Sequence, residues 1–91
     1  MLKVESEINV NVGKNVPTKV SLAVKSEFDI PRVVTITTSC GCTTTIPNFT
    51  IEPFSTKIID LTVTRPASGS VNVSFVTNGK FYSTKLNITV N

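Results

Sequence analysis

The 91-residue chain has 40% apolar and 16% charged side chains, which is enough for one small folded domain and excludes a disordered chain. Nine Lys and Arg against six Asp and Glu give a net charge of +3, but no two basic residues are adjacent. A nucleic-acid-binding surface is therefore not expected. No apolar run is long enough to span a membrane. We expect a single domain over residues 1–91 that binds neither nucleic acid nor membrane.

The first half of the chain alternates between apolar and polar residues, which is typical of half-buried strands. Five apolar residues fall on even positions, and they predict one strand of about eleven residues: Leu2, Val4, Ile8, Val10 and Val12. A turn at Gly13-Lys14-Asn15 follows. Two further strands are then predicted, and their apolar faces carry Val20, Leu22 and Val24 in one and Val34 and Ile36 in the other.

The second half continues this pattern after an irregular stretch. Residues 44–55 contain two prolines and predict a loop with one short strand near Thr50 and Ile51. Another strand carries Ile59, Leu61 and Val63. The last two strands flank Asn78-Gly79, a strong signal for a tight β-hairpin, because both turn positions need positive φ. About seven strands without helical periodicity predict an all-β fold, an antiparallel immunoglobulin-like β-sandwich, with a small barrel as the alternative.

The segment Cys40-Gly41-Cys42 contains both cysteines of a chain that has no histidine. If the third strand keeps its alternation, both thiols continue the face of Val34 and Ile36 and are buried in the core. A bulge at Gly41 would instead turn one of them outward. The sharper alternatives are a Cys40–Cys42 redox pair, or half of a zinc site completed by a second chain.

The sequence offers little else for catalysis. A cysteine nucleophile lacks a histidine base, and the six carboxylates are spread along the chain without a recognisable pair. A Gly-rich phosphate loop is also missing. We expect no enzyme activity, no cofactor, no metal site and no small-molecule substrate.

The hairpin supplies a candidate surface for a protein partner. A two-residue turn at Asn78-Gly79 pairs Phe75 with Tyr82 on one face and Val76 with Phe81 on the other. If the first pair faces the core, the second faces solvent. The predicted partner contacts are Phe54, Val76, Phe81 and Phe49. The alternative is that a loop covers the outer pair, or that this pair only stabilises the hairpin.

Several motifs together resemble an immunoglobulin-like domain family of uncharacterised function, related to the ASH, HYDIN and PapD-like group. Ser39 to Thr43 match its Ser-Cys-Gly-Cys-Thr signature, Ile51-Glu52-Pro53 its turn, and Thr77-Asn78 the step into its last hairpin. The resemblance covers nearly the whole chain and implies the sandwich fold, not a reaction. Where the family has glycine after the proline, this chain has Phe54, which implies a different turn with an apolar side chain at its tip.

Members of this family usually follow a secretion or lipoprotein signal, whereas this sequence starts directly with a strand. In that respect it resembles immunoglobulin-like accessory proteins that decorate bacteriophage particles. The resemblance implies a virion accessory protein, made in the host cytoplasm, that binds capsid or other assembly proteins or itself. The alternatives are a thiol-redox or metal-handling protein using Cys40 and Cys42, and an envelope or adhesion module whose signal was removed.

Overall fold

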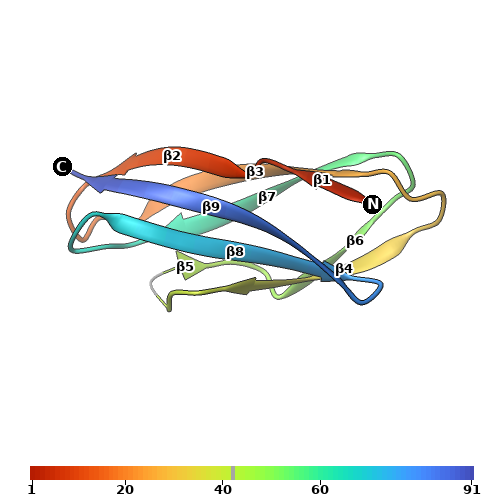
Figure 1. Cartoon of the computed structure of the whole chain (residues 1–91). Helices are drawn as coiled ribbons and strands as arrows, with labels where there is room; N and C mark the ends of the chain where they lie inside the picture. The colour runs from red at the N-terminus through yellow and green to blue at the C-terminus, as the bar shows by residue number, and fades with distance from the viewer. Residues whose placement is uncertain (42) are drawn as a thin grey trace.

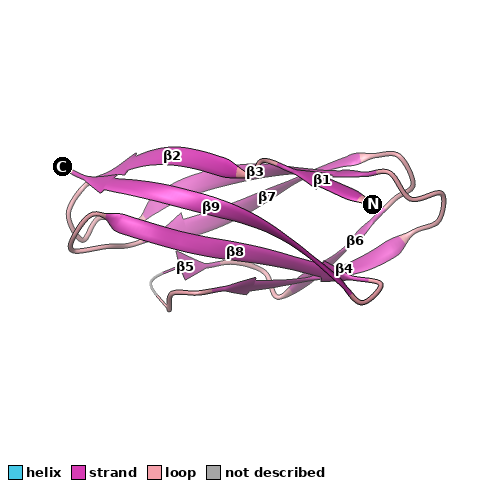
Figure 2. Ribbon diagram, viewed as in Figure 1, coloured by secondary structure: helices cyan, strands magenta, loops and turns pink. Residues whose placement is uncertain are grey.

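The structure is a computed structural model that describes residues 1–41 and 43–91. All regular structure in these residues is β-strand (Figure 2). No described residue belongs to a helix that could cross a membrane. The strands are β1 (Leu2–Val4), β2 (Glu7–Val12), β3 (Thr18–Ser26), β4 (Arg32–Thr38), β5 (Thr43–Thr44), β6 (Asn48–Ile51), β7 (Thr56–Val63), β8 (Gly69–Thr77) and β9 (Lys80–Val90).

The strands form two sheets packed face to face in an elongated sandwich of 42 × 19 × 17 Å (Figure 1). The four-stranded sheet has the order β1-β3-β7-β5, and the five-stranded sheet has the order β2-β9-β8-β4-β6. All pairs are antiparallel except β2 with β9, which is parallel. The two-sheet arrangement confirms the predicted all-β, immunoglobulin-like sandwich.

The predicted strand over residues 2–12 is in fact two strands, and this part of the prediction was wrong. β1 pairs with β3 in the four-stranded sheet, whereas β2 pairs with β9 in the other sheet. The chain crosses between the sheets at Glu5 and Ser6, which lie between the two strands. Alternation runs through the crossing unchanged, because both halves point their even residues into the same core.

The core follows the predicted alternation closely. In β3 every second side chain from Val20 to Ser26 is buried, and the side chains between them are exposed. The largest fully buried side chain is Phe75, near the C-terminal end of β8. Replacing such a side chain by alanine typically costs about 3–5 kcal/mol of unfolding free energy, because a cavity remains. Both sheets contribute to this core from their inner faces, so their outer faces are left for contacts with other molecules.

Candidate protein-binding surface

The hairpin between β8 and β9 has the predicted turn. Asn78 and Gly79 both have positive φ, 52° and 72°, as a type I′ turn requires. Phe75 lies opposite Tyr82, and Val76 lies opposite Phe81. Since Phe75 is fully buried, the Val76–Phe81 pair is on the outer face of the five-stranded sheet. This confirms the predicted geometry of the hairpin.

Three apolar residues form what we call the hairpin patch: Phe81, Val76 and Val33. Phe81 is 78% exposed and Val33 is 62% exposed. Thr35 of β4 lies opposite Val76. Val33, two residues before Thr35, is therefore the diagonal neighbour of Val76 on the same face. The Thr77 hydroxyl donates a hydrogen bond to the Val33 carbonyl oxygen at 3.0 Å and ties β4 to the end of the hairpin.

Val33 was missed by the sequence analysis, although the sequence carries a signal for it. Two consecutive valines in an alternating strand must place one side chain on each face. Val34 is fully buried, so Val33 is the outward one. The pairing that brings it beside Val76 joins strands about forty residues apart, and local pattern does not reveal such a pairing.

The rest of this outer face is polar and largely uncharged. Serine, threonine and asparagine side chains follow the patch along β8, β9 and β4, among them the half-buried Ser74 and the exposed Ser83 and Thr37. At the far edge, the Asn87 side chain donates hydrogen bonds to the carboxylate of Glu7 and, at 3.2 Å, to the side-chain oxygen of Asn9. The hairpin patch is therefore the apolar part of a neutral polar face.

Phe49 does not belong to this surface, and the prediction that it contacts a partner is contradicted. Only 7% of Phe49 is exposed, and it packs in the core. The reason is the short strand β6, in which Phe49 and Ile51 alternate inward while Asn48 and Thr50 point outward. In the sequence, Phe49 falls within a predicted loop, and a loop does not determine which way a side chain points.

Phe54 is 67% exposed at the turn between β6 and β7, as predicted. Its φ is 52°, in the left-handed region that glycine adopts at the lowest cost. Phe54 thus takes a glycine-like conformation, contrary to the expectation that it changes the turn. The Ser55 amide and hydroxyl close the turn by donating hydrogen bonds to the Glu52 carbonyl oxygen, at 3.3 and 2.7 Å.

The end of β4, which leads to Cys40, lies at the opposite end of the sandwich from the hairpin (Figure 1). β4 ends at Thr38, and Cys40 follows it, half-buried against the core. Cys40 is disulfide-bonded rather than the buried free thiol that was the leading interpretation. Cys42, the other member of the candidate redox pair, lies outside the described residues, so the activity of the pair stays a prediction.

A cationic side chain that the sequence analysis missed lies beside Cys40. The Arg65 guanidinium Nη1 is 3.9 Å from the Cys40 sulfur, and its Nε donates a hydrogen bond to the Ala67 carbonyl oxygen at 3.1 Å. Gly69 leaves the room for it, because a Cβ there would lie 2.4 Å from an Arg65 nitrogen. Cys40 and Arg65 are 25 residues apart, and only the packing of the two loops brings them together.

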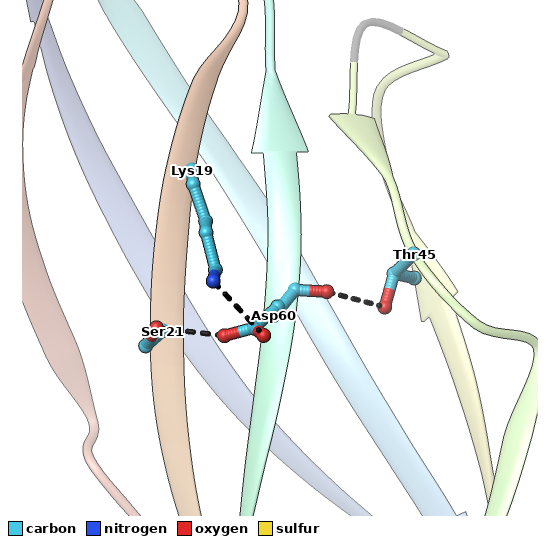
Figure 3. A network of polar contacts seen from close by, with 4 residues as sticks. All are labelled: Lys19, Ser21, Thr45 and Asp60. Atoms are coloured by element: carbon cyan, nitrogen blue, oxygen red, sulfur yellow. Dashed lines mark hydrogen bonds and ion pairs between the residues drawn. The ribbon is translucent and has the colours of Figure 1, made fainter.

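The outer face of the four-stranded sheet carries a polar network around Asp60 (Figure 3). The Ser21 hydroxyl donates a hydrogen bond to the Asp60 carboxylate at 2.7 Å, and the Lys19 ammonium lies 3.4 Å away. The hydrogen bond from Ser21 is the main cause that holds the pKa of the Asp60 carboxyl below its ordinary value; desolvation opposes it, and the nearby Lys19 lowers the pKa further. The Thr45 hydroxyl donates to the Asp60 carbonyl oxygen at 3.5 Å. The network therefore joins β3 to β7, and through Thr45 it also joins β7 to the segment after β5.

No protein-family model matches the chain, and no curated protein matches it by sequence. Solved structures do match. WR4, a C. elegans member of the MSP family, superposes with a TM-score of 0.81 at 10% identity over 98% of each chain. The ASH/PapD-like domain 7 of human CEP192 superposes with a TM-score of 0.73 at 6% identity, over 99% of this chain and 84% of that chain.

A bacterial relative in structure is the E. coli chaperone DraB, with a TM-score of 0.77 at 11% identity. The match covers 99% of this chain and 55% of DraB, so this chain spans about half the length of that chaperone. At identities this low, the superpositions show a shared fold and nothing more. The comparisons thus agree with the sheet order that the chain has the immunoglobulin-like sandwich fold seen in these MSP and ASH/PapD-like domains.

Proposed function

We propose that this domain is a non-enzymatic protein-binding module whose contact surface is the hairpin patch. The observation that carries the proposal is the exposure of Phe81, an aromatic side chain that is 78% open to solvent in a regular strand pairing beside the hairpin turn. Aromatic residues are enriched at protein interfaces and often dominate their binding energy. The polar residues around the patch match the rim of an interface, which is polar and accessible to solvent.

The similar structures support a binding role through their fold. They include DraB and the chaperone YadV, whose names describe proteins that act on other proteins. Phe54 extends the proposed surface at the same end of the sandwich, since the β6–β7 turn and the hairpin both lie at the end where the N-terminus lies (Figure 1). The patch is small, so firm attachment needs several copies or several contacts acting together.

The proposed setting is a virion, with the module attached to capsid or other assembly proteins. This setting rests on the resemblance to particle-decorating immunoglobulin-like proteins. The first test is quantitative mass spectrometry of purified particles from the source system, with the main shell protein as reference. We expect a fixed ratio set by the particle's symmetry. Absence of the chain from the particles removes the virion setting but leaves the hairpin patch open to test with other partners.

The patch is tested by comparing Phe81→Ser with Lys85→Ser, which removes another long side chain from the outer face of β9. Each purified variant is added to particles or to the partner protein, and the bound fraction is measured at equilibrium. We expect Phe81→Ser to bind at least tenfold more weakly, a change of about 1.4 kcal/mol, and Lys85→Ser to bind like the native chain. Equal binding by all three proteins, with unchanged folding, overturns the patch assignment.

The guanidinium beside Cys40 favours a second candidate function, thiol–disulfide exchange. In such a reaction the thiolate of a dithiol reductant attacks the disulfide, and the electron pair of the broken bond passes to the leaving sulfur. A guanidinium 3.9 Å from Cys40 stabilises the thiolate formed there. Reduction by dithiothreitol should then be slower in Arg65→Gln than in the native chain. Equal reduction rates for the two proteins contradict this second candidate. An envelope or metal-handling role is supported by the sequence alone.

A further inference from the structure

Two lysines lie directly opposite each other at one edge of the four-stranded sheet. Lys3 of β1 pairs in register with Lys25 of β3, and both side chains are on the outer face of that sheet. Like charges directly opposite each other destabilise an antiparallel strand pair, and most sheets avoid them. The same row continues to Thr56 of β7, which lies opposite Lys25 on its other side.

The protein compensates this pair of positive charges only weakly. The Lys3 ammonium is 3.7 Å from a Glu27 carboxylate oxygen, and both side chains are open to solvent, so the contact contributes little. Among the residues described, Lys25 forms no ion pair. Lys19 of the same strand differs, because it has Asp60 at 3.4 Å. The charge of Lys25 is therefore available to a ligand.

The two lysines line an open depression of about 570 Å³ where the chain passes from β1 towards β2. This size lies within the usual range for ligand sites. Ala23, which has a short side chain, and two hydroxyl-bearing residues, Ser6 and Thr56, also line the depression. The lining residues thus include two lysines and two hydroxyl-bearing residues, whose side chains can donate hydrogen bonds, and Glu5 is the acidic residue among them.

We propose that this depression, which we call the lysine pocket, binds an oxyanion group, a carboxylate or phosphate, between Lys3 and Lys25. Charge-assisted hydrogen bonds from ammonium groups to such oxyanions are among the stronger polar contacts in proteins. Glu5 repels a second negative charge and can accept a hydrogen bond from an N–H group. This combination favours the acidic side chain of a peptide over a free phosphate ion. The lysine pocket lies on the sheet opposite the hairpin patch and does not depend on the proposed function.

The test is a titration of the ¹⁵N-labelled full chain followed by amide chemical shifts. Two probes, inorganic phosphate and a pentaglutamate peptide, are added at constant ionic strength, with sodium chloride as the reference. We expect saturable shifts limited to residues 3–6, 23–25 and 56, with a dissociation constant on the order of millimolar for phosphate. Tighter binding of the peptide identifies an acidic side chain as the ligand, and tighter binding of phosphate identifies a free oxyanion.

The matched variants are Lys25→Gln and Lys19→Gln, which remove the same charge from the same face of β3. We expect Lys25→Gln to weaken binding of both probes by about tenfold or more and Lys19→Gln to leave it nearly unchanged. Lys25→Gln should also unfold at a temperature no lower than the native chain, since it relieves the like-charge pair. Shifts that do not saturate with either probe, or equal weakening by both variants, overturn the proposal.

Discussion

The two turns at the end of the sandwich where the N-terminus lies both need a residue with positive φ, but they use different residue types for it. The β8–β9 hairpin turns through Asn78 and Gly79, at φ 52° and 72°, and these are the residue types that adopt this conformation most easily. The β6–β7 turn passes through Phe54 at φ 52°, where a bulky side chain costs about 1–2 kcal/mol. Local preference and fold agree at the first turn and conflict at the second.

The residues of the β8–β9 turn are explained by folding alone, whereas Phe54 needs an explanation other than the stability of its turn. Natural sequences satisfy local preferences nearly everywhere, and exceptions concentrate at functional sites. Phe54 is 67% exposed, so burial in the core does not repay its strained backbone. A contact between Phe54 and a partner, as proposed for this end of the domain, would explain why a strained aromatic residue is present there.

The largest expected effect comes from damaging the turn in which sequence and fold agree. A Cβ at Gly79 meets no atom within 4 Å, so Gly79→Val adds backbone strain without a clash. Valine is especially disfavoured at positive φ. We expect the free energy of unfolding to fall by about 2 kcal/mol, measured by urea denaturation.

The matched control for this change is Gly41→Val. A Cβ at Gly41 also meets no atom within 4 Å, and its φ is not in the left-handed region. We expect this variant to unfold within about 0.5 kcal/mol of the native chain, as most surface changes do. If both glycine variants lose the same free energy, the hairpin turn does not depend on left-handed backbone at Gly79.

The second prediction repairs the strained turn. Phe54→Gly and Phe54→Ala both remove the exposed ring, but only glycine removes the penalty for positive φ. We expect the glycine variant to be more stable than the alanine variant by about 1 kcal/mol in urea denaturation. Both variants should attach more weakly to a partner. Equal stability of the two variants would falsify the assignment of strain to Phe54.

The strand pattern and the hairpin could be predicted because they depend on neighbours in sequence. Alternation alone placed Phe75, Val76 and Phe81 on their correct faces. The crossing at Glu5 and Ser6 could not be predicted in this way, because a chain that moves between two sheets sharing one core keeps the same alternation.

Contacts between distant segments were beyond the reach of local pattern. The contact of Arg65 with the Cys40 sulfur depends on how two loops pack, and the position of Val33 beside Val76 depends on which strands pair. Phe49 was misplaced for a related reason. Its four-residue strand is defined by pairing with β4, since the pattern of its own residues is too short to fix an orientation.

A third prediction asks how much the Val76–Phe81 pair contributes to the hairpin itself. A double-mutant cycle with Val76→Thr and Phe81→Thr, followed by urea denaturation, should give a coupling of about 0.5 kcal/mol, as expected of a cross-strand pair. The Ser74–Ser83 pair, also directly opposite on this face, is the reference. A coupling well above about 1 kcal/mol would make the pair a structural element of the hairpin and weaken its assignment to a partner.

The smallest expected effect concerns the Ser21–Asp60 contact, which joins two exposed side chains on the neighbouring strands β3 and β7. Ser21→Ala removes the hydrogen bond that does most to lower the pKa of Asp60, so we expect this pKa to rise towards its ordinary value in an NMR titration. A carboxyl whose pKa is lower in the folded chain contributes stability at pH values above its unfolded pKa, and this contribution is lost as the pH falls through the folded pKa. Ser21→Ala should therefore lose a little stability at neutral pH and almost none in acid. Ser83→Ala, an exposed serine on the other sheet, should leave the Asp60 titration unchanged; an unchanged titration in Ser21→Ala as well would assign the lowered pKa to Lys19 instead.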